Sequence, residues 1–165
     1  MRIFITGIDG YLGWTLAQYL VARGHTVAGA DAMLRRQWVE ELNSQSAIPI
    51  YSREERIAAF KEHYGVDLDF REGDFMDYEF TKNFFAEFKP DTIVHLGQVP
   101  SAPYSMIDRD HTVFTQQNNV IGNLNILWAM KEVCPEAHLV KLGTMGEYGT
   151  PNIDIPEGFF EEIGR

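Results

Sequence analysis

The sequence predicts an α/β fold in which helices cover both faces of a parallel sheet. Short runs rich in β-branched and aromatic residues alternate along the chain with longer segments of helical periodicity, which is the pattern of such a sheet. The first run leads directly into a glycine-rich turn, and the second ends in an aspartate. We expect one doubly wound domain over residues 1–149, with strand order 3-2-1-4-5, and the start of a substrate-region loop over 150–165.

The first strand, residues 2–6, is followed at once by Gly7-Ile-Asp9-Gly10-Tyr11-Leu12-Gly13. In such a turn the first glycine permits the bend, the second lets the backbone approach a diphosphate, and the third lets the next helix pack close to the sheet. That helix starts at residue 11, shows leucines at helical spacing and stops near Gly24. Its N-terminal N–H groups would meet phosphate oxygens, so we expect the whole turn to contact a dinucleotide.

The second strand, residues 26–30, ends in Asp31, 18 residues after Gly13. A carboxylate at this distance can accept hydrogen bonds from the ribose hydroxyls of a bound adenosine and repels a 2′-phosphate, which favours NAD over NADP. Arg35 and Arg36 follow closely. These guanidinium groups could clamp a 2′-phosphate, hold the NAD diphosphate or face water, and the residues alone leave the three possibilities open.

The remaining elements follow in order along the chain. A long connection with two helices, at 35–42 and 53–64, precedes the third strand, and Ser52 with Glu55 forms a capping-box pattern for the second of these helices. The later elements are a strand at 68–71, a helix at 77–88, a strand at 92–96, a helix at 110–133 and a strand at 138–142.

Polar residues or glycines follow these later strands, where a dinucleotide would cross the sheet edge. Asp74 is placed to meet the adenine amino group, although it could instead cap a helix or turn. Gly97 would let the backbone approach a ribose, although it could be a plain turn glycine. The other cofactor contacts that we expect are Phe75, Leu96, Asn119 and Leu142. We expect no metal site.

The composition narrows the class of protein. The net charge is −10, which argues against a nucleic-acid partner because phosphate backbones require clustered positive charge. The sequence contains no run of about 18 apolar residues, so we expect no membrane span. The first strand begins at residue 2 and Cys134 is the single cysteine; both features predict a cytoplasmic protein.

Several motifs together resemble the extended short-chain dehydrogenase/reductases that act on nucleotide sugars. They are the glycine turn, Gly73-Asp74, Asn119-Val-Ile-Gly-Asn-Leu-Asn125, and Leu142-Gly-Thr144 with Tyr148-Gly149. Three longer segments, 101–108, 118–122 and 141–154, are similar to the UDP-sulfoquinovose synthases, and the last is the most specific. The resemblance extends from residue 1 to about residue 158.

This resemblance implies a Rossmann-type enzyme that joins sulfite to UDP-glucose with a tightly held NAD. Hydride would leave C4 of the glucose, water would be lost across C5 and C6, sulfite would add to C6, and hydride would return to C4. Thr144 is the catalytic residue that it implies, with its hydroxyl on the C4 oxygen, although a plain strand-end threonine is the alternative. The implied substrate contacts, each equally open to a structural role, are Ser101, Tyr104, Ser105, Met106, Met145 and Glu147.

Two features depart from the family pattern. The synthases typically carry Glu-Gln-Arg where this chain has Gln98-Val99-Pro100, and the change removes charged groups that could handle an anionic nucleophile. The Tyr-x-x-x-Lys proton relay is expected on the helix after the fifth strand, but the one such string, Tyr78 to Lys82, follows the third strand. A nucleotide-sugar epimerase or dehydratase of other specificity, and a non-catalytic NAD-binding or assembly module, therefore stay as alternatives.

The same departures lead to two expectations about the isolated chain. Without the relay pair it should not turn over substrate. Strand five should also lie at an exposed sheet edge, and exposed edges and apolar surfaces favour association. We expect the chain to form a homo-oligomer or to bind its missing half.

Overall fold

The computed structural model describes residues 1–144 and residue 149. Its centre is a five-stranded sheet in the order β3-β2-β1-β4-β5, and every strand pair is parallel. The strands are β1 (Arg2–Thr6), β2 (Thr26–Asp31), β3 (Asp69–Glu72), β4 (Thr92–His95) and β5 (His138–Lys141). The predicted fold class and strand order are confirmed.

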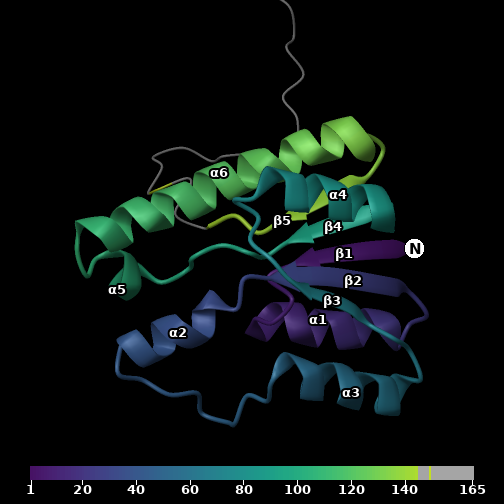
Figure 1. Cartoon of the computed structure of the whole chain (residues 1–165), viewed down its shortest axis with the longest axis horizontal. Coiled ribbons are helices and arrows are strands. Elements are labelled where there is room, and N and C mark those ends of the chain that lie inside the picture. The colour runs from purple at the N-terminus through teal and green to yellow at the C-terminus, as the bar shows by residue number, and fades with distance from the viewer. Residues whose placement is uncertain (145–148, 150–165) are drawn as a thin grey trace, which may run out of the picture.

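Helices cover both faces of the sheet (Figure 1). On one face lie α1 (Tyr11–Val21) and α3 (Arg53–Tyr64), and on the other lie α4 (Tyr78–Phe88) and the long α6 (Arg109–Val133). Two shorter helices, α2 (Leu34–Glu41) and α5 (Ala102–Ser105), lie beyond the carboxyl ends of the strands. Among the described residues, none of the helices is apolar over a stretch long enough to cross a membrane.

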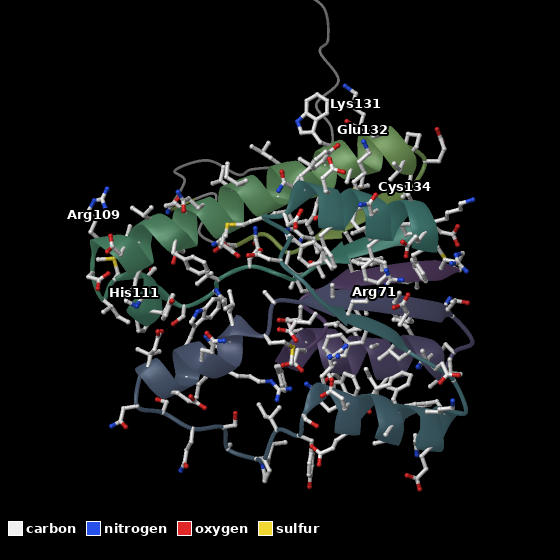
Figure 2. All side chains as sticks on the ribbon, in the orientation of Figure 1. Arg71, Arg109, His111, Lys131, Glu132 and Cys134 are labelled. Carbon is white, nitrogen blue, oxygen red and sulfur yellow. The ribbon has the colours of Figure 1, made fainter. Side chains whose placement is uncertain are left out.

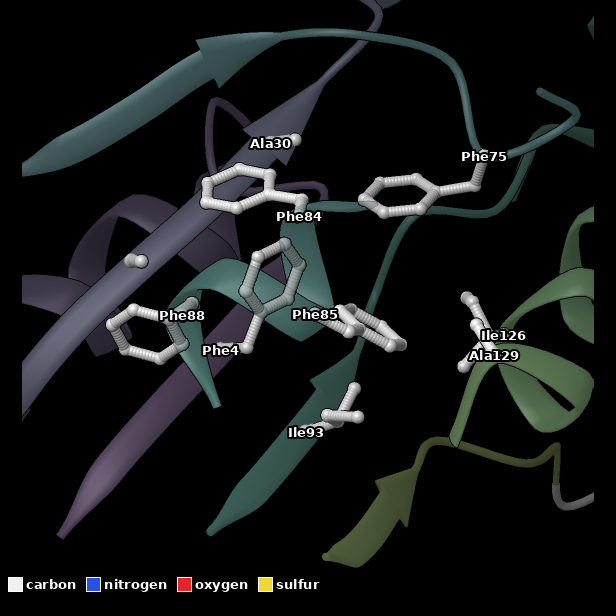
Figure 3. Packing of buried hydrophobic residues seen from close by; sticks show 10 residues of the cluster. Phe4, Ala30, Phe75, Phe84, Phe85, Phe88, Ile93, Ile126 and Ala129 are labelled. Carbon is white, nitrogen blue, oxygen red and sulfur yellow. The ribbon is translucent and has the colours of Figure 1, made fainter. Parts of the chain in front are cut away.

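Each face of the sheet has its own hydrophobic core, because side chains alternate along a strand. On the α4 and α6 face, Phe4 is fully buried beneath three phenylalanines of α4, and its ring meets those of Phe84 and Phe85 edge to face at 4.8 and 4.9 Å (Figure 3). On the α1 and α3 face, Ile3 and Ile5 pack with residues of both helices. Helices therefore cover both faces of the sheet, and in this class of fold a ligand binds beyond the carboxyl ends of the strands.

Most predicted elements are confirmed to within one or two residues. The capping box is formed: the Ser52 side chain accepts from the Glu55 N–H, and the Glu55 carboxylate accepts from the Ser52 N–H. Gly24 has φ +80° and follows α1, where the chain turns back toward β2. The helix α5 was not predicted; it is a single turn whose N-cap is Ser101.

Candidate dinucleotide site

A cavity of about 660 Å³ opens along the carboxyl edge of the sheet. It is bounded by the glycine turn, α2, and the segments that follow β2, β3, β4 and β5. Thirteen of the residues predicted from the sequence line it: Gly7, Gly10, Tyr11, Leu12, Gly13, Asp31, Arg35, Asp74, Phe75, Leu96, Gly97, Leu142 and Thr144.

The glycine turn is packed so tightly that two of its positions exclude a side chain. A Cβ at Gly13 would overlap the Gly7 carbonyl oxygen and lie 2.8 Å from the Cα of Ile8. Gly7 has φ +71°, and a Cβ there would lie 2.9 Å from the Cα of Gly97. The third glycine thus lets α1 pack close to the sheet, as the sequence predicted, and the first also lets the segment after β4 lie close against the turn.

The N-terminus of α1 is left open on the cavity side. Its N-cap, Gly10, provides no side-chain hydrogen bond, and its first turn contains no acidic residue. By contrast, three other helices have an N-cap side chain that accepts a hydrogen bond from a backbone N–H. These side chains are Ser52 for α3, Asp77 for α4 and Asp108 for α6. Unpaired N–H groups beside a glycine turn form a site for phosphate oxygens, so this end of the cavity fits a dinucleotide diphosphate.

Asp31 is positioned by the backbone on both sides of it. One carboxylate oxygen accepts from the Met33 N–H at 2.8 Å, and the other accepts from the Asp9 N–H at 3.1 Å. Burial raises the pKa of Asp31, and the hydrogen bond from Met33 opposes that rise. Each carboxylate oxygen has a second lone pair, so the group can also accept from the two ribose hydroxyls of an adenosine.

A buried pair that sequence reasoning missed fixes the segment after β4. The Thr6 hydroxyl oxygen accepts from the N–H groups of Leu96 and Gly97 at 3.0 and 2.9 Å. It also lies 2.7 Å from His95 Nδ1. Because both lone pairs of the oxygen are engaged, its proton must go to Nδ1. His95 is therefore the neutral Nε2–H tautomer.

The surroundings of His95 agree with a neutral ring. Burial, with a smaller contribution from the charge of Lys141, lowers the pKa of His95 to about 4. Thr6 and His95 are register partners in β1 and β4. The only available signal in the sequence was a threonine at the end of the first predicted strand and a histidine one residue before the end of the fourth.

Asp9 and Arg36 were predicted to contact the cofactor. In the structure they pair with each other, and neither is among the residues that line the cavity. Their contact with a cofactor stays a prediction. Arg36 donates to both carboxylate oxygens of Asp9 at 2.9 Å. Arg56, which the sequence analysis missed, also bonds the Asp9 carboxylate and donates to its carbonyl oxygen at 3.0 Å. The hydrogen bonds that Arg36 donates to the Asp9 carboxylate raise the pKa of Arg36, whereas burial lowers the pKa of Arg56.

Asn119 holds a loop beside the cavity. Its side-chain oxygen accepts from the Val99 N–H at 2.8 Å and its amide donates to the Val99 carbonyl at 3.1 Å. The neighbouring Asn118 lines the cavity. Asn119 thus contacts the segment 98–100 in the structure, and contact with a cofactor stays a prediction.

The four predicted substrate residues that the structure describes are not among those that line the cavity. Tyr104 is buried beside Trp38 of α2, with ring centroids 4.9 Å apart. Ser101 caps α5, and Met106 is 77% exposed. Ser105 donates to the carbonyl of its own helix. Met145 and Glu147 lie outside the described residues. A role in substrate binding stays a prediction for all six.

A small hydrophobic cluster forms one wall of the cavity beyond β4. Trp38 of α2 packs with Val99 and Tyr104, and both Trp38 and Val99 line the cavity. Gln98 and Pro100 line it too, so the three residues that depart from the synthase pattern all face the site. The charged side chains in the lining are Asp31, Asp74, Arg35 and Lys141.

The site has the features of a dinucleotide-binding site and, in the part of the chain that the structure describes, no cluster of metal ligands. An open helix N-terminus fits a diphosphate, and Asp31 fits a ribose at one end of it. Thr144 follows β5 at the other end. Fold and site together define a Rossmann-type dinucleotide-binding protein.

Comparison with known families agrees with this class. The NAD dependent epimerase/dehydratase family matches residues 3–163. The chain belongs to this family, and the cofactor of the family is NAD, as the sequence predicted.

Two curated relatives are similar over nearly the whole chain. UDP-sulfoquinovose synthase of Sulfolobus acidocaldarius is 49% identical over 98% of this chain, and the chloroplastic UDP-sulfoquinovose synthase of Spinacia oleracea is 51% identical over 96%. This chain spans 41% of the length of the first relative and 33% of the second. The resemblance to the synthases stated above is thus confirmed for the part of the protein that the chain contains.

Solved structures confirm the fold. A UDP-glucose-4-epimerase from Stenotrophomonas maltophila, with bound NAD and formylated UDP-arabinopyranose, matches 93% of this chain at a TM-score of 0.68 and 20% identity, and 40% of that chain is covered. A UDP-glucose 4-epimerase of Thermus thermophilus in complex with NAD matches 81% of this chain at a TM-score of 0.59 and 26% identity, with 34% of that chain covered.

Proposed function

We propose that this chain is the NAD-binding part of a UDP-sulfoquinovose synthase, an enzyme that makes UDP-sulfoquinovose from UDP-glucose and sulfite. The observation that carries the proposal is the identity of about one half to two synthases over nearly the entire chain. The cavity supports it, because its lining combines a diphosphate site, a ribose acceptor and the threonine that the family resemblance marks as catalytic.

The two ends of the cavity would bind different groups, NAD at one end and the sugar at the other. The α1 N-terminus and Gly10 would hold the NAD diphosphate, and Asp31 would accept from the adenosine ribose. Bound NAD supplies reversible removal of a hydride from a sugar carbon. Thr144 would orient the sugar by a hydrogen bond to its C4 oxygen. Gln98, Val99 and Pro100 would form an uncharged wall beside the sugar.

Turnover also needs a group that takes the C4 hydroxyl proton, and the sequence supplies none in the expected place. The single Tyr-x-x-x-Lys string is Tyr78 to Lys82. It lies on α4, where Lys82 pairs with Glu132 of α6 at 2.6 Å, and neither Tyr78 nor Lys82 lines the cavity. We therefore propose that the chain binds NAD but does not by itself convert UDP-glucose.

Binding measurements test the cofactor half of the proposal. Isothermal titration should show NAD binding to the 165-residue chain. Asp31→Ala should weaken that binding by about 1–3 kcal/mol, because charge-assisted hydrogen bonds to ribose are lost. An unchanged affinity in this variant would remove Asp31 from the site, and absence of binding to the wild type would refute the proposal.

A second candidate is an epimerase or dehydratase of other specificity. It is favoured by Gln98, Val99 and Pro100, which line the cavity and carry no charge for an anionic nucleophile. A longer protein that carries this chain together with a Tyr-x-x-x-Lys pair separates the two candidates. Consumption of UDP-glucose that depends on sulfite supports the synthase, whereas consumption without sulfite supports the second candidate.

We also propose that an apolar surface on α6 and β5 is covered in the working protein, by a second copy or by a further part of the synthase. Leu124, Leu127 and Trp128 on α6 are 42–52% exposed, and Leu142 after β5 is 52% exposed. Apolar areas of this kind favour association. Sedimentation velocity tests the proposal, and a monomer at all concentrations would count against self-association.

A further inference from the structure

The carboxylate of Asp9, in the middle of the glycine turn, is engaged by two arginines from distant parts of the chain. Arg36 of α2 forms a bidentate pair with it, with both N–O distances at 2.9 Å. Arg56 of α3 bonds the same carboxylate. The Asp9 side chain is only 6% exposed and that of Arg56 only 12%. Bidentate, partly buried guanidinium–carboxylate pairs are among the strong polar interactions in proteins.

The long connection between β2 and β3 supplies both arginines. Arg36 lies five residues after Asp31, and Arg56 lies on the next helix. The guanidinium of Arg56 also rests 4.0 Å above the ring of Trp14 in α1. The connection thus folds back onto the glycine turn at Asp9, through its side chain and its carbonyl oxygen.

Asp9 and its two arginines lie next to Asp31, the residue whose carboxylate favours NAD over NADP. The Asp9 N–H donates to Asp31 at 3.1 Å, and Asp31 lines the cavity at the adenosine ribose end. The charge of Arg36 interacts with both carboxylates. A guanidinium just after the second strand of this fold is the group that holds a 2′-phosphate in NADP-binding proteins.

We propose that Asp9 sets the cofactor selectivity of this chain by holding Arg36 and Arg56 away from the ribose, so that the site takes a free 2′-hydroxyl and rejects a 2′-phosphate. The inference rests on the NAD binding proposed above. To hold a phosphate, Arg36 must leave a buried carboxylate, and removing a partner from a buried charge is strongly unfavourable. Asp31 adds repulsion of its own, so two carboxylates act together against NADP.

Titrations of NAD and NADP into the 165-residue chain test this selectivity. In the variant Asp9→Ala, Arg36 is released toward the ribose. We expect NADP to bind roughly tenfold to hundredfold more tightly than to the wild type, as one or two charge-assisted hydrogen bonds would give. The double variant Asp9→Ala/Arg36→Ala should lose that gain. The gain should persist in Asp9→Ala/Arg35→Ala when its NADP affinity is compared with that of Arg35→Ala alone, because Arg35 already lines the cavity and its loss can change cofactor affinity by itself.

Asp69 offers a matched control. It forms a similar bidentate pair with Arg71, both distances being 2.9 Å, but neither residue lines the cavity. Figure 2 shows Arg71 over the strands, on the other side of the view from α2. Asp69→Asn should change neither NAD nor NADP affinity. If it raises NADP affinity as Asp9→Ala does, the effect is one of overall charge and the proposal is wrong.

The possible failures can be told apart. A wild-type chain that binds no NAD defeats the proposed function, whereas a wild type that binds NAD and a folded Asp9→Ala variant that gains no NADP affinity defeat only this inference. Asp9→Asn, which keeps an acceptor oxygen, serves if Asp9→Ala does not fold.

A further test of the inference uses the wild-type chain alone. The Arg36 Nε–H signal in NMR should keep its protection from solvent exchange when NADP is added in excess. Loss of that protection on NADP binding would mean that Arg36 leaves Asp9 for the phosphate, and the proposal would be overturned.

Discussion

The two ends of the cavity differ in how they are held. At the β1–β2 end, Asp31 accepts two backbone hydrogen bonds, and Asp9 beside it is 6% exposed between two arginines. At the β5 end, every residue from 140 to 144 is exposed, and Val140 and Leu142 are 41% and 52% exposed. The part that we assign to the adenosine is thus completed within this chain. The part that we assign to the sugar has little around it in the described residues.

This difference agrees with the proposal that the chain holds the cofactor but does not by itself convert the sugar. A cofactor site needs a rigid turn, a helix N-terminus and one carboxylate, and these come from residues 7–31. The proposed chemistry needs a proton relay that the sequence does not contain in the expected place.

The largest effect is expected for Gly13→Ala. The added methyl group would overlap the Gly7 carbonyl and lie 2.8 Å from the Cα of Ile8, and neither backbone atom can move without moving β1. We expect a loss of about 3–5 kcal/mol in the free energy of unfolding, measured by denaturant titration. Gly65→Ala is the control, because nothing lies within 4 Å of its Cβ position and only its φ of +67° opposes the change; it should cost about 1 kcal/mol. Equal losses would show that the turn is not the rigid element.

Thr6→Val should have the next largest effect on stability. The variant keeps the shape of the side chain but leaves the N–H groups of Leu96 and Gly97, and Nδ1 of His95, without their shared partner. We expect a loss of about 2–3 kcal/mol in stability together with weaker NAD binding, because Leu96 and Gly97 line the cavity.

Thr81→Val provides the comparison for Thr6. Thr81 is also fully buried, but its hydroxyl donates only to the Asp77 carbonyl, so the loss should be below about 1 kcal/mol and NAD affinity should not change. A Thr6 variant no worse than the Thr81 variant would exclude a special role for the pair with His95.

A dependence of stability on pH follows from His95. Its pKa is lowered to about 4 in the folded chain, while an unfolded histidine titrates near about 6.5. The unfolded state therefore binds the proton first, and stability is lost as pH falls from 6.5 toward 4. Between pH 7 and pH 5 the His95 contribution should be about 2 kcal/mol.

Thermal or denaturant unfolding of two histidine variants checks this contribution. His95→Asn should remove it, whereas His138→Asn, at an exposed position that begins β5, should keep it. A pH dependence that is the same in both variants would assign it to other groups.

Short-range patterns account for what the sequence predicted. The strand, turn, helix, strand and aspartate of residues 2–31 are contiguous, so periodicity and glycine spacing fix them. The contacts that the sequence did not predict join residues far apart: Thr6 and His95 are 89 positions apart, and Asp9 and Arg56 are 47. Nothing in a local pattern shows that a guanidinium on the fourth element further along the chain will neutralise a particular aspartate.

The segment predicted to bind the substrate also shows that a local pattern does not reveal contacts with distant residues. Tyr104 stands in a segment that resembles a family motif, yet its ring packs beside Trp38 of α2. Trp38 itself gave no signal, because an aromatic residue on a predicted helix indicates a core and does not identify its partner. A family motif can thus record residues that build the wall of a site as well as residues that touch the ligand.

The smallest effect is expected for Lys82→Met, which tests whether a motif out of its structural context has any role. Lys82 is the last residue of the single Tyr-x-x-x-Lys string, and it is not among the residues that line the cavity. It pairs at the protein surface with Glu132 of α6, which is labelled in Figure 2. Surface ion pairs contribute little to stability. Both NAD affinity and unfolding free energy should therefore match the wild type within error, as should those of Glu132→Gln. A loss of NAD affinity in the Lys82 variant alone would return the string to the site and contradict its placement on α4.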